Sequence, residues 1–156
     1  MSTVSYLTID GEIVSENRGG THRDYLPDPL GSTVALLDNS QTKTDSWSYG
    51  AWGTATRLSG ATDTPFQFVG TLGYYSDSTS QLYVRARYYR PTLGRWMTSD
   101  PYWPEERAFT YSQCSPITYT DPTGTQTVEQ LPIICGGWCA GKNKSFLRWC
   151  NNGVGT

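Results

Sequence analysis

The feature that most constrains the fold is a recurring unit in which a tyrosine is followed within a few residues by a glycine. The unit occurs at Tyr25 to Gly31, Tyr49 to Gly53 and Tyr89 to Gly94. An aromatic side chain suits the end of a half-buried strand, and glycine allows the tight turn that follows. Degenerate repeats of this kind predict a layered, spiralling sheet in which each unit covers its neighbour. The edges of such a sheet must be capped or paired with another chain.

The composition also favours short strands joined by turns. The chain of 156 residues contains 16 Gly, 9 Pro, 11 Tyr and 6 Trp. Aromatic residues fit a pleated surface, whereas Gly and Pro interrupt it. The dipeptide Asp10-Gly11 lies between two strand-like runs within residues 6–14, which is a strong signal for a β-hairpin. We therefore expect an all-β fold of short strands and turns, with helix at most in 107–113 and 144–150.

Alternation of residue types predicts several further strands. Residues 32–37 follow a turn, and residues 46–58 alternate aromatic and small side chains, as a half-buried strand does. Residues 82–89 follow a polar turn at 76–80 and alternate in the same way. This pattern assigns one face to Leu82, Val84, Ala86 and Tyr88, and the other to Tyr83, Arg85, Arg87 and Tyr89.

Charge and hydropathy argue against several classes of partner. The net charge of −2 argues against nucleic acid or an anionic membrane as the main partner. No stretch approaches the roughly 20 apolar residues that a membrane-spanning helix needs. Residues 1–10 lack the basic region and apolar core of a signal peptide. We expect no nucleic-acid partner and no membrane span, and an exported, extracellular or cell-surface location reached without a visible signal peptide.

Five segments resemble, in this order, the core domain associated with Rhs/YD-repeat proteins. They are DPLGSTVALLD (28–38), SYGAWG (48–53), TPFQFVG (64–70), YVRARYYRPTLGRWMTSDP (83–101) and YSQCSPITYTDPTG (111–124). The resemblance implies an Rhs repeat-associated core domain over residues 1–125 and a variable C-terminal tail over 126–156. Proteins of this family are large β-rich shells that enclose a toxic or otherwise variable C-terminal segment, and the core closes the shell. The implied partners are such a shell or further copies of this chain.

The resemblance also implies a self-cleaving aspartic protease built on two Asp-Pro motifs. The two family aspartates fall on Asp100 and Asp121, and the bond that is cut falls on Thr125–Gln126. One carboxylate would activate water while the other, protonated, would polarise the carbonyl. Two like charges in contact raise one pKa, which supplies this mixed protonation state. No metal and no cofactor is expected.

A structural turn explains the second motif equally well. Asp-Pro-x-Gly is a favourable type I turn, and residues 28–31 have this form without an expected catalytic role. The chain also has Tyr102-Trp103 where the family has glycine and leucine, and Thr125 where the family has an apolar leucine before the cut. The protease and turn-only interpretations therefore both stay open.

The run at residues 83–101 is too basic for a buried strand and too aromatic for an ordinary loop. We expect its planar cations and rings to join neighbouring layers of the sheet rather than to bind an acidic partner. The residues assigned to this structural seam are Arg85, Arg87, Tyr88, Tyr89, Arg95 and Trp96.

Four cysteines are unevenly placed, at Cys114, Cys135, Cys139 and Cys150. A zinc site built on the three tail cysteines would lack one ligand unless Cys114 completed it. Disulfides are the interpretation we favour, with one bridge and an odd thiol, or two bridges if Cys114 takes part.

Three functions follow from these patterns. The first is a core module that packages or presents the C-terminal segment and cuts itself after Thr125. The second is a non-enzymatic structural subunit that assembles through exposed β-edges into an oligomer or fibre. In the third, the tail 126–156 is a small toxin or membrane-active effector, with clustered cations between its aromatic residues.

Overall fold

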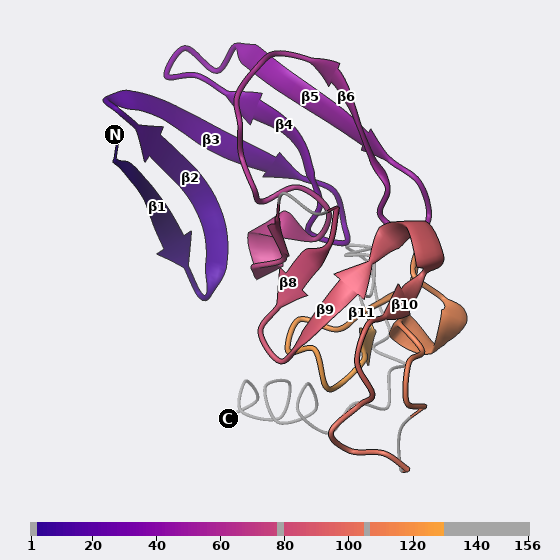
Figure 1. The fold of residues 1–156 in the computed structure, drawn as a ribbon. Helices are drawn as coiled ribbons and strands as arrows, with labels where there is room; N and C mark the ends of the chain where they lie inside the picture. The colour runs from indigo at the N-terminus through magenta and orange to yellow at the C-terminus, as the bar shows by residue number, and fades with distance from the viewer. Residues whose placement is uncertain (1–2, 78–79, 105–106, 130–156) are drawn as a thin grey trace, which may run out of the picture.

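The structure is a computed structural model that describes residues 3–77, 80–104 and 107–129 (Figure 1). Its regular structure is almost entirely β-strand, which confirms the all-β prediction. The strands are β1 (Val4–Ile9), β2 (Glu12–Arg18), β3 (Thr21–Pro27), β4 (Thr33–Leu37), β5 (Lys43–Tyr49), β6 (Ala55–Ser59), β7 (Tyr75–Ser76), β8 (Leu82–Val84), β9 (Arg87–Arg90), β10 (Arg95–Trp96), β11 (Tyr119–Thr120) and β12 (Val128–Glu129). Three short 3-10 turns complete it: η1 (Gly70–Leu72), η2 (Pro91–Leu93) and η3 (Ser112–Cys114). No helix in these described ranges is long and apolar enough to cross a membrane.

The larger sheet is an antiparallel meander in which β1 to β6 lie side by side in chain order. The turn between β1 and β2 is Asp10-Gly11, and both residues have positive φ (51° and 85°). This is the backbone that a two-residue hairpin turn requires, and Asp-Gly is well suited to it. The predicted hairpin over residues 6–14 is therefore confirmed.

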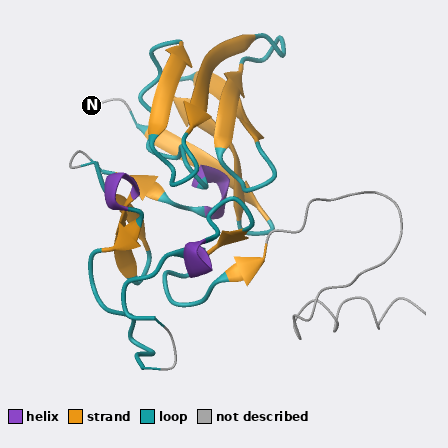
Figure 2. Cartoon of the chain, turned by 90° about the vertical axis from the view of Figure 1, so that its right-hand side faces the viewer, coloured by secondary structure: helices purple, strands orange, loops and turns teal. Residues whose placement is uncertain are grey.

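The other strands form two smaller sheets beside one end of the meander. One has the order β10-β9-β8-β7, and the other pairs β11 with β12. Figures 1 and 2 show the six-stranded sheet at one end of the molecule and the smaller sheets at the other. The segment 67–71 joins the two parts, because its backbone bonds to Thr33 (2.9 Å) and to Gly31 (3.0 Å) in the turn before β4.

Two clusters of buried side chains form the core. One lies in the six-stranded sheet and contains Ile13, Tyr25, Leu36 and Trp47. The other lies around the smaller sheets and contains Phe68, Val69, Tyr74, Leu82, Val84, Tyr89, Trp96 and Tyr111. Tyr49 packs against both clusters, so the core is continuous between the two parts.

The tyrosine and glycine units contact one another as the repeat pattern predicts. The Tyr49 hydroxyl donates to the carbonyl of Thr33 (2.6 Å), and the Tyr89 hydroxyl donates to the carbonyl of Trp52 (2.8 Å). Thr33 is the first residue of β4, just after the unit that ends at Gly31, and Trp52 lies in the turn of the unit that ends at Gly53. Gly94 has φ 60°, and a Cβ atom there would lie 2.9 Å from the Trp52 ring, so this turn requires glycine.

The prediction of one continuous strand over 82–89 is wrong. β8 ends at Val84 and β9 begins at Arg87, with Arg85 and Ala86 forming a two-residue turn between them. Arg85 has φ 45°, in the left-handed region. The turn breaks the alternation, so the buried residues of this hairpin are Leu82, Val84, Arg87 and Tyr89.

Two other segments also differ from the predictions. Residues 46–58 form parts of β5 and β6, because the backbone reverses at 50–53 through a hydrogen bond from Gly53 to Gly50 (2.8 Å). The expected helix at 107–113 is limited to the start of η3. The second expected helix, at 144–150, lies outside the described residues.

Candidate aspartate site

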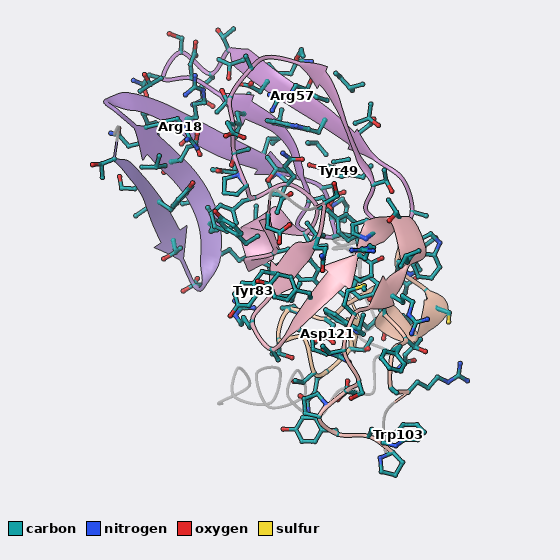
Figure 3. All side chains as sticks on the ribbon, viewed as in Figure 1. Arg18, Tyr49, Arg57, Tyr83, Trp103 and Asp121 are labelled. Carbon is teal, nitrogen blue, oxygen red and sulfur yellow. The ribbon has the colours of Figure 1, made fainter. Side chains whose placement is uncertain are left out.

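The candidate site lies where residues 121–124 pack on the tip of the β8–β9 hairpin, in the region where Figure 3 labels Asp121. Three consecutive carbonyl groups in this turn accept hydrogen bonds from three consecutive residues of the hairpin. The Arg85 side chain donates to Pro122, the Ala86 backbone N–H to Thr123 (3.4 Å), and Arg87 Nε to Gly124. The turn is therefore fixed on the hairpin residue by residue.

Arg87 is the centre of the site. Its side chain is buried and forms ion pairs with Asp100 Oδ2 (2.7 Å, from Nη1) and Asp121 Oδ2 (3.2 Å, from Nη2). The guanidinium carbon lies 4.1 Å from the centroid of the Trp96 ring, within the range of a cation–π contact. Burial lowers the pKa of Arg87 from its ordinary value, and the two carboxylates act in the opposite direction. The guanidinium thus joins two carboxylates that come from separate turns.

Asp121 also holds the two residues that flank the predicted cleavage bond. Its Oδ1 accepts the backbone N–H of Thr125 (3.0 Å), the N–H of Gln126 (3.0 Å) and the Thr123 hydroxyl (3.1 Å). Its own backbone N–H donates to the Tyr74 hydroxyl (3.0 Å). The carboxylate therefore lies directly beside the Thr125–Gln126 peptide bond.

Asp100 reaches the site from the loop after β10. Its Oδ1 accepts the backbone N–H of Tyr102 (2.9 Å), and its own N–H donates to the carbonyl of Ala108 (2.7 Å). The side chains of Tyr102 and Trp103 are exposed, and Figure 3 places Trp103 on a loop that projects from the body of the molecule. The chain differs from the family pattern at these two residues. Because their side chains are exposed, they do not disturb the ion pair between Asp100 and Arg87.

A polar cavity of about 360 Å³ adjoins the carboxylates. Arg87, Asp100, Asp121 and Thr125 are among the residues that line it. The other lining residues are Arg107, Thr110, Gln113 and Thr127. A cavity of this size and polarity has room for water next to the peptide bond.

The Asp-Pro-x-Gly turn at Asp28 shows what turn chemistry alone explains. Asp28 Oδ1 accepts the N–H groups of Leu30 (2.9 Å) and Ser32 (2.8 Å), as Asp121 Oδ1 accepts those of Thr125 and Gln126. Asp121 differs in its burial and in the ion pair of its second oxygen with Arg87. The pairing with Arg87 and, through it, with Asp100 goes beyond what a turn needs.

The six residues assigned to a structural seam lie in different surroundings. Arg87 covers Trp96, and Tyr89 packs on both Trp96 (5.6 Å between centroids) and Tyr111 (4.1 Å). Arg95 lies over Phe109 (4.7 Å), Tyr88 contacts Tyr83 on the surface, and Arg85 binds the carbonyls of Pro122 and Leu72.

Two parts of the site were not found by sequence reasoning. Arg87 was assigned to the seam, and its role as partner of both aspartates was missed. Tyr74 was not singled out, although its buried hydroxyl contacts Asp121 and also Tyr111 (3.2 Å). The turn at Arg85-Ala86 changes which residues of the hairpin face inward, so the alternation pattern did not single out Arg87, and no local pattern marks Tyr74.

The cysteine predictions lie mainly outside the described residues, which include Cys114 alone of the four. Cys114 is exposed, and no other described residue is joined to it by a disulfide. Among the described residues, no group of three or more His, Cys, Asp or Glu side chains is arranged to hold a metal ion.

Several known proteins contain segments similar to this chain, although no family model matches it. The tRNA3(Ser)-specific nuclease WapA of Bacillus spizizenii is 28% identical over 131 residues, which cover 78% of this chain and 6% of that protein. The double-stranded DNA deaminase toxin A of Burkholderia cenocepacia is 30% identical over 122 residues, 72% of this chain and 8% of that protein. The chain thus spans less than a tenth of the length of these relatives.

Solved structures share the fold. The crystal structure of TcdB2-TccC3 has a TM-score of 0.70 and 21% identity over 79% of this chain and 7% of that one. TcdB2-TccC3 without its hypervariable C-terminal region has a TM-score of 0.69 and 20% identity over 79% of this chain and 6% of that one. The fold of the described residues therefore occurs in a neighbour that lacks the hypervariable region.

These comparisons support the expectation that this chain is related to Rhs-associated toxins. They do not assign it to the core domain in particular. They contradict the exclusion of nucleic acid, because the names of the relatives specify tRNA or double-stranded DNA. The net charge was a poor basis for excluding a nucleic-acid partner, because it averages over the whole chain. A chain with a slightly acidic total can still contain local groups of cations, such as Lys142, Lys144 and Arg148.

Proposed function

We propose that this chain is the part of a toxin protein at which a β-folded framework ends and a C-terminal effector segment begins. Residues 1–125 form the framework and 126–156 belong to the effector. The observation that carries this proposal is that the sequence relatives include a tRNA-specific nuclease and a double-stranded DNA deaminase toxin. The match to a neighbour without its hypervariable C-terminal region supports the framework role of the β-sheets. The names of the relatives make nucleic acid the first substrate class to test.

Inducible expression in bacteria tests the effector role. We expect the full chain and residues 126–156 to slow growth or to damage tRNA or DNA, and a chain ending at Thr125 to be harmless. Growth curves and electrophoresis of total nucleic acid give the two readouts. Equal, undisturbed growth with all three, together with intact nucleic acid, would contradict the proposal.

Self-cleavage at Thr125–Gln126 is a second candidate function that one observation favours. Asp121 Oδ1 accepts the N–H groups of both residues of this bond, and Asp100 shares Arg87 with it beside a cavity that can hold water. In the reaction we propose, Asp100 takes a proton from a water molecule as the water oxygen bonds to the Thr125 carbonyl carbon. The C–N bond then breaks, and Asp100 passes this proton to the Gln126 nitrogen, which Asp121 Oδ1 holds through its N–H. The new Thr125 carboxyl group gives its proton to the amine, so the products are a carboxylate on Thr125 and an α-ammonium on Gln126.

Intact mass under denaturing conditions tests this reaction. The wild-type chain should give fragments 1–125 and 126–156 after incubation, whereas Asp100→Asn and Asp121→Asn should stay whole. Asp28→Asn is the matched control, because Asp28 has the same turn without the link to Arg87. A whole wild-type chain, or cleavage of Asp121→Asn at the wild-type rate, would refute self-cleavage.

A further inference from the structure

The segment after the predicted cut is attached to the framework by more than the peptide bond. β12 (Val128–Glu129) pairs antiparallel with β11 (Tyr119–Thr120), with Thr120 opposite Val128. β11 directly precedes Asp121, and residues 122–124 are fixed on the β8–β9 hairpin. Both sides of the bond are therefore held by the same body, on strands and turns that do not depend on the bond.

Hydrolysis would change the group that faces Asp121. The Gln126 nitrogen lies 3.0 Å from Asp121 Oδ1 and donates one neutral N–H. After the cut, this nitrogen becomes an α-ammonium, which is protonated at neutral pH and carries a positive charge. In the intact chain only the carboxylate of this hydrogen bond is charged, whereas an ammonium adds a direct attraction between opposite charges. The contact would thus become stronger as the covalent bond is lost.

The charges of the buried groups fit an added cation. Asp100 and Asp121 contribute two negative charges, and Arg87 contributes one positive charge. This buried set of three residues keeps one unbalanced negative charge, which one ammonium would neutralise. The new Thr125 carboxylate would share the cavity wall with the exposed Arg107. Burial of Asp121 shields its pair from water, which strengthens it further.

From this geometry we propose that Asp121 becomes a binding site for the N-terminal α-ammonium of Gln126, and that this pair and the β11–β12 ladder retain the cut segment on the framework. The inference rests on the proposed cleavage for its biological setting. The binding of the Gln126 α-ammonium by Asp121 requires only that the Thr125–Gln126 bond is cut, whichever agent cuts it.

The test therefore uses two ways to make the nick. In the first, wild-type chain that has cut itself passes through gel filtration in native buffer, and denaturing mass spectrometry identifies the fragments in each fraction. In the second, Thr125→Lys is cut by lysyl endopeptidase in a chain whose other lysines, Lys43, Lys142 and Lys144, are replaced by arginine. Circular dichroism before and after the cut checks that the framework stays folded.

We expect the fragments to elute together in both cases. In the nicked Thr125→Lys chain, Asp121→Asn should raise the dissociation rate of the 126–156 fragment about 10- to 100-fold, the size expected for a hydrogen bond to a charged group. Asp28→Asn should leave the rate unchanged, and Val128→Pro should raise it, because proline is disfavoured within a paired strand.

Immediate separation of the fragments in the nicked chain would overturn the inference, as would equal rates for Asp121→Asn and Asp28→Asn. If the wild type stays whole but the nicked chain retains its fragment through Asp121, self-cleavage fails and the binding site stands. If the wild type cuts itself and then loses the tail at once, cleavage stands and retention fails.

Discussion

Replacing Arg87 with methionine should be among the most destabilising single changes in the framework. The variant loses ion pairs to Asp100 (2.7 Å) and Asp121 (3.2 Å), the bond to the Gly124 carbonyl and the contact with Trp96. The main cost is that two buried carboxylates are left without their shared cation. Removal of one partner from a buried ion pair costs about 3–5 kcal/mol, a large part of the total stability of a domain of this size.

A compensated variant separates this cause from a loss of packing. Arg87→Met combined with Asp100→Asn and Asp121→Asn contains no uncompensated buried charge, and it should recover at least half of the lost free energy of unfolding. Arg95→Met is the control, because Arg95 is an exposed arginine over the Phe109 ring, a contact worth about 1 kcal/mol or less. Urea unfolding followed by tryptophan fluorescence and circular dichroism measures all three. The reasoning is wrong if Arg87→Met and Arg95→Met lose similar amounts, or if the triple variant is as unstable as Arg87→Met.

Three further predictions concern pH and packing. Burial alone would raise the pKa of Asp45, but hydrogen bonds from Thr62 and other donors outweigh burial and lower it. The stabilisation from Asp45 should therefore be present above about pH 4 and be lost as the pH falls below, as urea unfolding of wild type and Asp45→Asn at pH 3 to 6 would show. Burial raises the pKa of Tyr111 to about 12. The stabilisation from the neutral Tyr111 side chain should therefore persist up to about pH 10 and be lost as the pH rises toward 12. Absorbance titration at high pH and unfolding of Tyr111→Phe check this prediction. Gly94→Ala should destabilise by about 1–3 kcal/mol, because φ is 60° and the new Cβ would press on Trp52, whereas Gly50→Ala, with no such clash, should cost less in the same urea assay.

The sequence predicted the parts of the fold that depend on local chemistry. Asp10-Gly11 marks a hairpin because both residues tolerate positive φ. The β8–β9 turn was missed because Arg85-Ala86 contains neither Gly nor Asn, and a non-glycine residue at positive φ is uncommon. Tertiary contacts to Pro122 and Leu72 accompany this conformation of Arg85, and no window of sequence displays them.

The candidate site depended on information of a different kind. The resemblance to Rhs proteins singled out Asp100 and Asp121, and the structure brings both to one guanidinium. Spacing along the chain could not provide Arg87, because its burial depends on a turn that the alternation pattern concealed. It also could not provide Tyr74, which lies 47 positions from the aspartate whose N–H it accepts.

The bond from Tyr89 to the Trp52 carbonyl has a mechanical consequence. It ties the turn that follows β5 to a ring cluster that also contains Trp96, and Trp96 supports Arg87. A pull on the chain beyond β12 would pass through β11 and Arg87 into this cluster, and from there into the six-stranded meander. Any machine that extracts the C-terminal segment by force would then act against the whole body of the protein, and the meander would serve as its anchor.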